Sequence, residues 1–108
     1  MAEIIKLVQS DTLPQLKLTL TDDITNLPIN LTGATVNLHV RAAGTSVLSF
    51  TRPATVTDAV NGIAVVQWQV GDLDRAPGTY EAEVEIIIGV GRETIYDLIT
   101  LQIREDIA

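Results

Sequence analysis

The side chains of this sequence that could do acid–base or metal chemistry are one histidine and a set of carboxylates. His39 is the only histidine, and it falls on the outward phase of a predicted strand. Nucleophilic catalysis needs an activated hydroxyl beside the imidazole, but Ser10, Ser46 and Ser49 have no elbow-like context. A single histidine in a chain without cysteine also cannot complete a zinc site. We therefore expect no catalytic residue and no cofactor, and read His39 as a solvated or interface side chain.

Two pairs of aspartates lie in predicted loops, where calcium takes its oxygen ligands. They are Asp22 with Asp23, and Asp72 with Asp74. No EF-hand pattern surrounds them. Aspartate also bonds its own backbone in turns, and this structural use is the one we favour. Calcium binding stays open as the alternative.

Glu81, Glu83 and Glu85 alternate along one strand and form an acidic ladder. Glycoside hydrolysis needs carboxylates opposed across a cleft, so three on one side of one strand do not predict catalysis. The ladder could meet a neighbouring subunit, but we favour pairing within the chain. The basic residues considered for that pairing are Lys17, Arg41 and Arg104.

Trp68 alternates with Val66 and Val70, which places it in the core. The alternative is a carbohydrate- or receptor-binding module with an exposed Trp68 or Tyr96. Aromatic residues make up only 4% of the chain, so a stacking platform has little support.

Apolar and polar residues alternate almost throughout, which predicts strands rather than helices. The expected strands cover residues 4–8, 15–21, 34–41, 47–52, 54–57, 63–70, 79–88 and 92–104. The phase predicts that Val36, Leu38, Trp68, Val84 and Ile86 are buried, and that Ile88 also points inward.

The strongest fold signal is the Pro77-Gly78 turn followed by Tyr80, two residues inside a long alternating strand. A tyrosine at this place is typical of a tyrosine corner, in which the hydroxyl bonds to backbone a few residues upstream. The sequence therefore predicts a single all-β domain over residues 1–108, an immunoglobulin-like antiparallel β-sandwich.

Composition excludes several classes of protein. The formal charge of −7 and the lack of a basic stripe argue against binding to nucleic acid. No apolar run is long enough to cross a bilayer, and the N-terminus lacks the pattern of a signal peptide. The absence of cysteine fits synthesis in a reducing cytoplasm, and we expect neither a membrane partner nor a small-molecule substrate.

Contact surfaces are then the place to look for function. Residues 1–11 read as an N-terminal arm or edge strand, because Pro14 cannot sit in a central ladder. We predict that the arm contacts a neighbour, or else that a face of the sandwich does. The predicted interface residues are Ile4, Ile5, Leu7, Val65, Gln67 and Ile87.

Three patches, taken in order and spacing, carry a resemblance to a known family. They are residues 8–14 (VQSDTLP), residues 30–36 (NLTGATV), and a stretch from Asn61-Gly62 through Asp72-Leu73 to residues 77–83 (PGTYEAE). Together they resemble the N-terminal domain of the phage baseplate upper proteins, over nearly the whole chain. The resemblance implies an attachment module that docks on the tail-tip core, while later segments carry the receptor-binding proteins.

The expected function is therefore that of a non-enzymatic structural protein of a tailed-phage virion, most simply in the baseplate or tail. Its expected partners are other virion proteins and copies of itself, and a virion protein of this kind is made in the bacterial host cytoplasm. The sequence given stops at Ala108, where members of that family continue into helical and distal parts, so decoration of the capsid is kept as an alternative.

Overall fold

The computed structural model describes residues 4–12, 15–22, 24–95 and 99–107. Within those ranges every regular element is a strand, which confirms the all-β prediction. The strands are β1 (Ile4–Val8), β2 (Leu16–Thr19), β3 (Ala34–Ala42), β4 (Leu48–Asp58), β5 (Ile63–Val66), β6 (Gly78–Ile88), β7 (Gly91–Thr94) and β8 (Ile99–Arg104). The described residues contain no helix that is long and apolar enough to cross a membrane.

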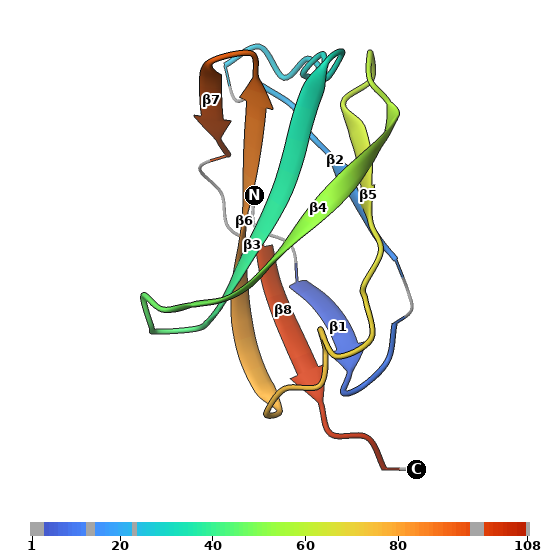
Figure 1. Ribbon diagram of the computed structural model, residues 1–108, viewed down its shortest axis with the longest axis vertical. Coiled ribbons are helices and arrows are strands. Elements are labelled where there is room, and N and C mark those ends of the chain that lie inside the picture. The colour runs from blue at the N-terminus through green and yellow to red at the C-terminus, as the bar shows by residue number, and fades with distance from the viewer. Residues whose placement is uncertain (1–3, 13–14, 23, 96–98, 108) are drawn as a thin grey trace.

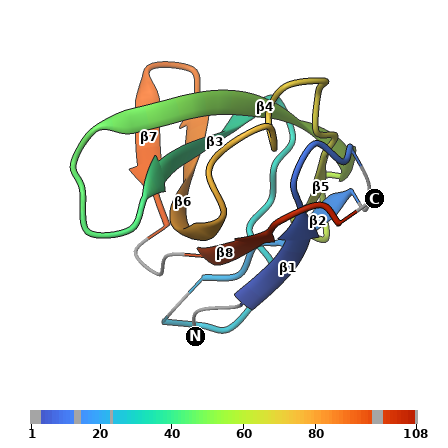
Figure 2. The ribbon, with the colours of Figure 1, turned by 90° about the horizontal axis from the view of Figure 1, so that it is seen from below.

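The strands join into one continuous, strongly curled sheet. Its order is β1-β8-β6-β3-β4-β5-β2, and β7 pairs with β6. Figure 2 shows the path curving from β1 and β8 round to β4, β5 and β2. The prediction of two stacked antiparallel sheets is corrected in two respects. The sheet is not divided into two, and β1 runs parallel to β8.

The curl depends on β4, which crosses the molecule diagonally (Figure 1). Its first part pairs with β3 and its last part with β5. The sequence predicted two strands here, broken at Pro53, but β4 is continuous. Proline is tolerated because β4 has only one described strand neighbour at that position, opposite Asn37 in β3, so no ladder on a second side is interrupted.

The long predicted strand over residues 92–104 is two strands. β7 pairs with the last part of β6, and β8 pairs with its first part. The predicted strand over residues 63–70 is shorter than expected, because the chain leaves the sheet after Val66. Both differences arise because alternation predicts extended chain but not its pairing partner.

The core lies inside the curl and follows the predicted phases. Val36, Leu38, Trp68, Val84 and Ile86 are all buried, as predicted. Ile88 was expected to point inward but is 48% exposed, because β6 ends there beyond the packed core. The remaining buried apolar residues are Leu7, Leu16, Leu18, Leu20, Leu31, Val40, Ala64, Val66, Leu73, Tyr80, Ala82, Leu101 and Ile103.

Candidate functional site

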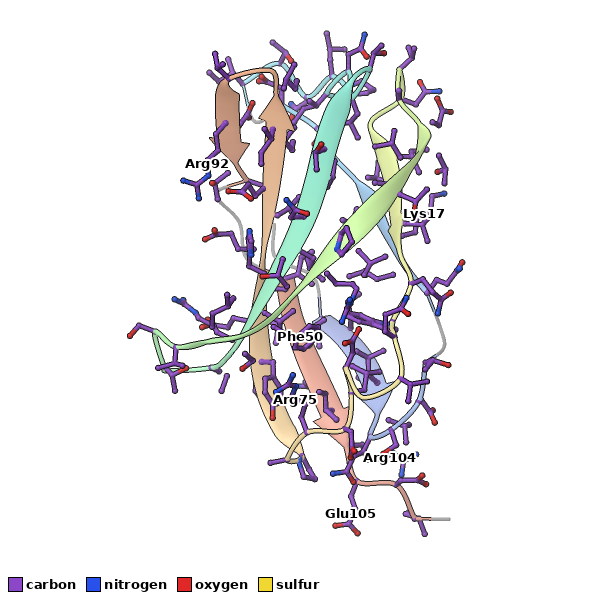
Figure 3. The ribbon with its side chains drawn as sticks, viewed as in Figure 1. Lys17, Phe50, Arg75, Arg92, Arg104 and Glu105 are labelled. Atoms are coloured by element: carbon purple, nitrogen blue, oxygen red, sulfur yellow. The ribbon has the colours of Figure 1, made fainter. Side chains whose placement is uncertain are left out.

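The outer face of β3, β4, β6 and β7 carries a connected cluster of polar side chains. His39 Nε2 lies 3.1 Å from Glu85 Oε1, and His39 Nδ1 lies 2.8 Å from the Thr51 hydroxyl. Arg92 of β7 donates to the other oxygen, Glu85 Oε2. Asn37 donates a longer bond of 3.5 Å to Glu85 Oε1. Figure 3 shows Arg92 on β7, beside this face. The cluster borders a groove of about 310 Å³.

The electrostatics of this cluster keep Glu85 ionised. The hydrogen bond with His39, and then that from Arg92, lowers the pKa of the Glu85 carboxyl below its ordinary value. In the tautomer whose Nε2–H donates to Glu85, the Nδ1 atom of His39 accepts a hydrogen bond from the Thr51 hydroxyl. Thr51, His39 and Glu85 thus have the connectivity of a hydroxyl, a base and an acid. The Glu85 carboxylate already accepts hydrogen bonds from Arg92 and Asn37, however, so the arrangement acts as a hydrogen-bonded cross-link between strands.

The acidic ladder is partly neutralised within the chain, as predicted. Arg41 Nε donates to Glu81 Oε1 at 3.2 Å across the β3–β6 pair. The partner of Glu85 is Arg92, which the sequence analysis did not consider. Glu83 has no hydrogen-bond or ion-pair partner among the described residues. The predicted partners Lys17 and Arg104 do not contribute to this ladder in the part of the chain described.

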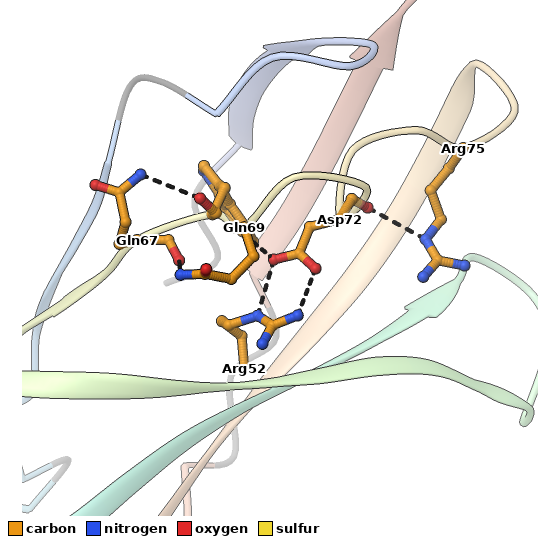
Figure 4. A network of polar contacts seen from close by, with 6 residues as sticks. Arg52, Gln67, Gln69, Asp72 and Arg75 are labelled. Atoms are coloured by element: carbon orange, nitrogen blue, oxygen red, sulfur yellow. Dashed lines mark hydrogen bonds and ion pairs between the residues drawn. The ribbon is translucent and has the colours of Figure 1, made fainter.

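Asp72 organises a second cluster, which is built into the interior (Figure 4). Its buried carboxylate accepts two bonds from Arg52, at 2.8 and 2.5 Å, and one from the Gln69 backbone N–H at 2.8 Å. Arg75 donates to the Asp72 carbonyl and places its guanidinium 4.8 Å from the centre of the Phe50 ring. These contacts tie the loop of residues 67–77 to β4.

The predicted aspartate sites are thus turn and ion-pair chemistry in this structure. Asp22 accepts hydrogen bonds from the Ile24 and Thr25 backbone N–H groups, which lower the pKa of its carboxyl. Asp72 is held by Arg52. Within the described ranges, no three His, Cys, Asp or Glu side chains are arranged to hold a metal ion. Asp23 lies outside the described residues.

The tyrosine corner is confirmed. Tyr80 Oη donates to the Ala76 carbonyl, four residues upstream, at 2.8 Å, and the ring is buried. The prediction that Trp68 lies in the core is also confirmed, with its ring 6.3 Å from that of Phe50 in an edge-on arrangement. Trp68 therefore cannot serve as an exposed platform. Tyr96 lies outside the described residues.

The predicted interface residues are placed in three settings. In β1, Ile4 is 61% exposed, Ile5 packs partly against the core and Leu7 is buried in it. Leu7 is therefore a core residue and not one whose side chain can reach a partner. Its burial follows from pairing with β8, where Leu7 lies opposite Ile103. Residues 4–8 form the edge strand of the sheet rather than a detached arm.

The other three predicted residues lie half-buried on the outer face. Val65 of β5 and Ile87 of β6 are separated by β3 and β4 in the sheet order. Gln67 donates to the Thr12 carbonyl at 2.8 Å and accepts from Gln15 at 2.6 Å. Much of its polar surface is thereby used inside the chain.

Comparison with known proteins decides the family. Residues 1–100 match the family model described as BppU N-terminal domain. The chain belongs to the BppU N-terminal domain family. No curated protein matches the sequence.

The BppU N-terminal domain family consists of structural proteins of the phage baseplate, the baseplate upper proteins. The chain is therefore a phage baseplate structural protein and a component of the virion. This agrees with the family that the sequence patches indicated. It also directs attention away from the acid–base clusters and toward the surfaces of the domain.

One surface of this BppU domain was missed by the sequence analysis. Three loops lie at the upper end of the sheet in Figure 1, and they and the adjoining end of β6 carry large apolar side chains that are exposed. We call this surface the apolar end and define it by Ile24, Leu27, Val60, Ile88 and Val90. A signal was available in the sequence, because Val90 stands between two glycines and Val60 precedes Asn61-Gly62, where turns ordinarily carry polar residues.

Proposed function

We propose that this chain is an assembly and attachment module of the baseplate that works by surface contact and not by catalysis. Its partners are other virion proteins. The observation that carries the proposal is the free edge of β1. This strand pairs with β8 on one side and has no strand partner among the described residues on the other. An edge of this kind offers unpaired backbone groups to a strand of another chain.

The geometry of β1 supports strand addition. The Gln9 backbone N–H donates to the Arg104 carbonyl, so it points toward β8. Backbone groups of alternate residues point to alternate sides of a strand, which places the N–H groups of Ile4 and Lys6 on the free side. Ile4 adds an exposed apolar side chain at the start of the same strand.

A groove of about 430 Å³ lies beside this edge, over β1, β8 and the start of β6. Lys6, Val8, Gln102 and Arg104 are among the residues that line it. Gly78 leaves it open, since nothing lies within 4 Å of where a Cβ would stand. A strand added to β1 could place a side chain in this groove, which would give the contact specificity as well as backbone hydrogen bonds.

The outer face that carries Val65, Gln67 and Ile87 is kept as an alternative contact surface. Contact between copies of this chain also stays a prediction. We also propose that the curled sheet is immunoglobulin-like. The tyrosine corner and the alternating strands support this.

The test is Lys6→Pro, which removes a backbone N–H on the free side of an edge strand, where proline is tolerated. Lys6→Thr is the matched control, because it removes the charge and keeps the N–H. We expect both proteins to fold by circular dichroism. Lys6→Pro should be lost from purified virions while Lys6→Thr is retained, as measured by quantitative mass spectrometry.

Incorporation of Lys6→Pro at the normal copy number would show that the β1 edge is not the connector. If Lys6→Pro does not fold, Ile4→Lys provides the same test by placing a charge on the edge without changing the backbone. Its normal incorporation would have the same meaning.

A further inference from the structure

Five of the ten large apolar side chains that are exposed in the described part of the chain belong to the apolar end. Ile24 is 92% exposed, and Val90 is fully exposed at the tip of the β6–β7 turn. Apolar residues scattered singly over a surface are ordinary, but a group drawn from several loops at one end is a mark of an interaction site.

The local sequence makes this group unusual. Turn tips favour Gly, Asn, Asp and Ser, because these residues adopt or stabilise turn conformations. Val90 instead lies between Gly89 and Gly91, and Val60 occupies the β4–β5 turn. Neither valine contributes to the core from these positions. Their side chains are therefore free to contact another molecule.

Hydrogen bonds hold two of the loops of the apolar end, the β2–β3 loop and the β4–β5 turn, side by side. The Leu20 N–H donates to the Gly62 carbonyl, and the Leu31 N–H donates to the Ala59 carbonyl, both at 2.8 Å. A Cβ at Gly62 would lie only 2.5 Å from the Leu20 carbonyl oxygen, so the contact between the β2–β3 loop and the β4–β5 turn is close.

The β6–β7 turn joins the same end through β3, because Ala34 pairs with Ile88. All three loops gather at one end of the 42 Å long axis (Figure 1). The apolar end is therefore a surface positioned by backbone contacts, with side chains from each loop.

The charges around the apolar end select the kind of partner. Asp22, Asp58 and Glu93 lie in these loops or next to them. The one basic residue in the described loops and strand ends here is Arg92, which is paired with Glu85. An acidic border repels nucleic acid and the anionic surface of a membrane, and it attracts a protein surface that carries Lys or Arg.

We infer that the apolar end binds a second virion protein, through an apolar patch on that protein bordered by Lys or Arg side chains. The inference rests on the proposed function, since it assigns a second contact surface to the same attachment module. The apolar end lies at the opposite end of the sheet from the groove beside β1. The domain could thus link two neighbours at once.

The experiment places a photo-crosslinking amino acid at Val60 or at Val90 of the full chain in assembling phage. Val70 is the matched control, because it is 94% exposed but lies in the loop of residues 67–77. We expect positions 60 and 90 to crosslink to the same virion protein, at peptides that contain Lys or Arg beside apolar residues. Position 70 should not crosslink to that protein.

A second arm compares the Val60→Ser/Val90→Ser protein with Val70→Ser. We expect the double variant to fold normally and to fall at least about tenfold in virions, a loss of about 1.4 kcal/mol of binding free energy or more. Val70→Ser should be incorporated normally.

Three results would overturn the inference: crosslinks from positions 60 and 90 to a second copy of this chain only, crosslinks to lipid only, or normal incorporation of the double variant. If the unaltered chain itself is missing from purified virions, the proposed function fails and not merely this surface. The two failures are therefore distinguishable.

Discussion

The loop of residues 67–77, toward the lower end of the sheet in Figure 1, directs polar groups such as the Asp72 carboxylate into the domain. The three loops of the apolar end instead expose apolar side chains. In the first region Asp72, Arg52 and Tyr80 find their partners inside the domain. In the second, Ile24 and Val90 are almost wholly exposed. The comparison indicates which loop serves the fold and which loops are available to another molecule. Changes at the first should therefore cost stability, and changes at the second should cost assembly.

The largest expected effect is at the lower end. Arg52→Leu leaves the buried Asp72 carboxylate without both of the hydrogen bonds that the Arg52 guanidinium donates. Breaking a buried pair by removing one partner typically costs about 3 kcal/mol or more. The free energy of unfolding from urea titration measures the loss. Arg41→Leu, which breaks the more exposed pair with Glu81, is the control and should cost less than about 1 kcal/mol. Equal losses would remove the distinction between the interior cluster and the outer face.

A smaller effect is expected at the tyrosine corner. Tyr80→Phe keeps the ring packed and removes the bond to the Ala76 carbonyl. One net hydrogen bond contributes roughly 0.5–1.5 kcal/mol, so thermal or urea unfolding should reveal a loss of that size. A variant as stable as the parent would mean that the corner does not hold the entry to β6.

Acid should weaken the outer face through Glu85. Its pKa is lowered in the folded protein, so the ionised form stabilises the fold above the ordinary value of 4.5. That contribution is lost as the pH falls through the lower folded pKa. Urea titrations from neutral pH to about pH 3 should show less acid destabilisation in Glu85→Gln than in the parent. Glu83→Gln is the control and should lose stability in acid as the parent does. If Glu85→Gln also loses as much stability as the parent, the hydrogen bonds of Glu85 do not contribute to the pH dependence.

The smallest effect on stability belongs to the apolar end. Val60→Ser and Val90→Ser remove exposed methyl groups that are not part of the buried core. Surface changes of this kind usually stay within about 0.5 kcal/mol. Differential scanning calorimetry should give melting temperatures close to that of the parent. A clear loss of stability would mean that these valines belong to the fold and are not held for a partner.

The sequence was sufficient for the local features of this domain. Alternation predicted the inward faces of β3 and β6, and the turn before Tyr80 predicted the corner. Each of these signals lies within a few residues. Residues 4–8 were harder, because Ile4, Ile5, Leu7 and Val8 are apolar in both phases of the strand. The burial of Leu7 was decided by its pairing with a strand almost a hundred residues away.

Pairings between distant residues account for the other differences. Arg52 lies 20 residues from Asp72, and His39 lies 46 from Glu85. No spacing rule connects such residues, because the curl of the sheet brings them together. The parallel pairing of β1 with β8 was missed for the same reason. The apolar end needed the structure as well, since the sequence does not show that the three loops carrying these side chains lie at the same end of the sheet.

The most direct test of the account compares backbone hydrogen exchange of the chain free in solution and assembled in the baseplate. We predict that assembly slows exchange in β1 and in the loops around residues 24–31, 58–62 and 88–91. Exchange in residues 69–77 should stay as it is in the free chain, because neither proposed contact surface includes that loop. Slower exchange confined to residues 69–77, with the apolar end unchanged, would contradict the account.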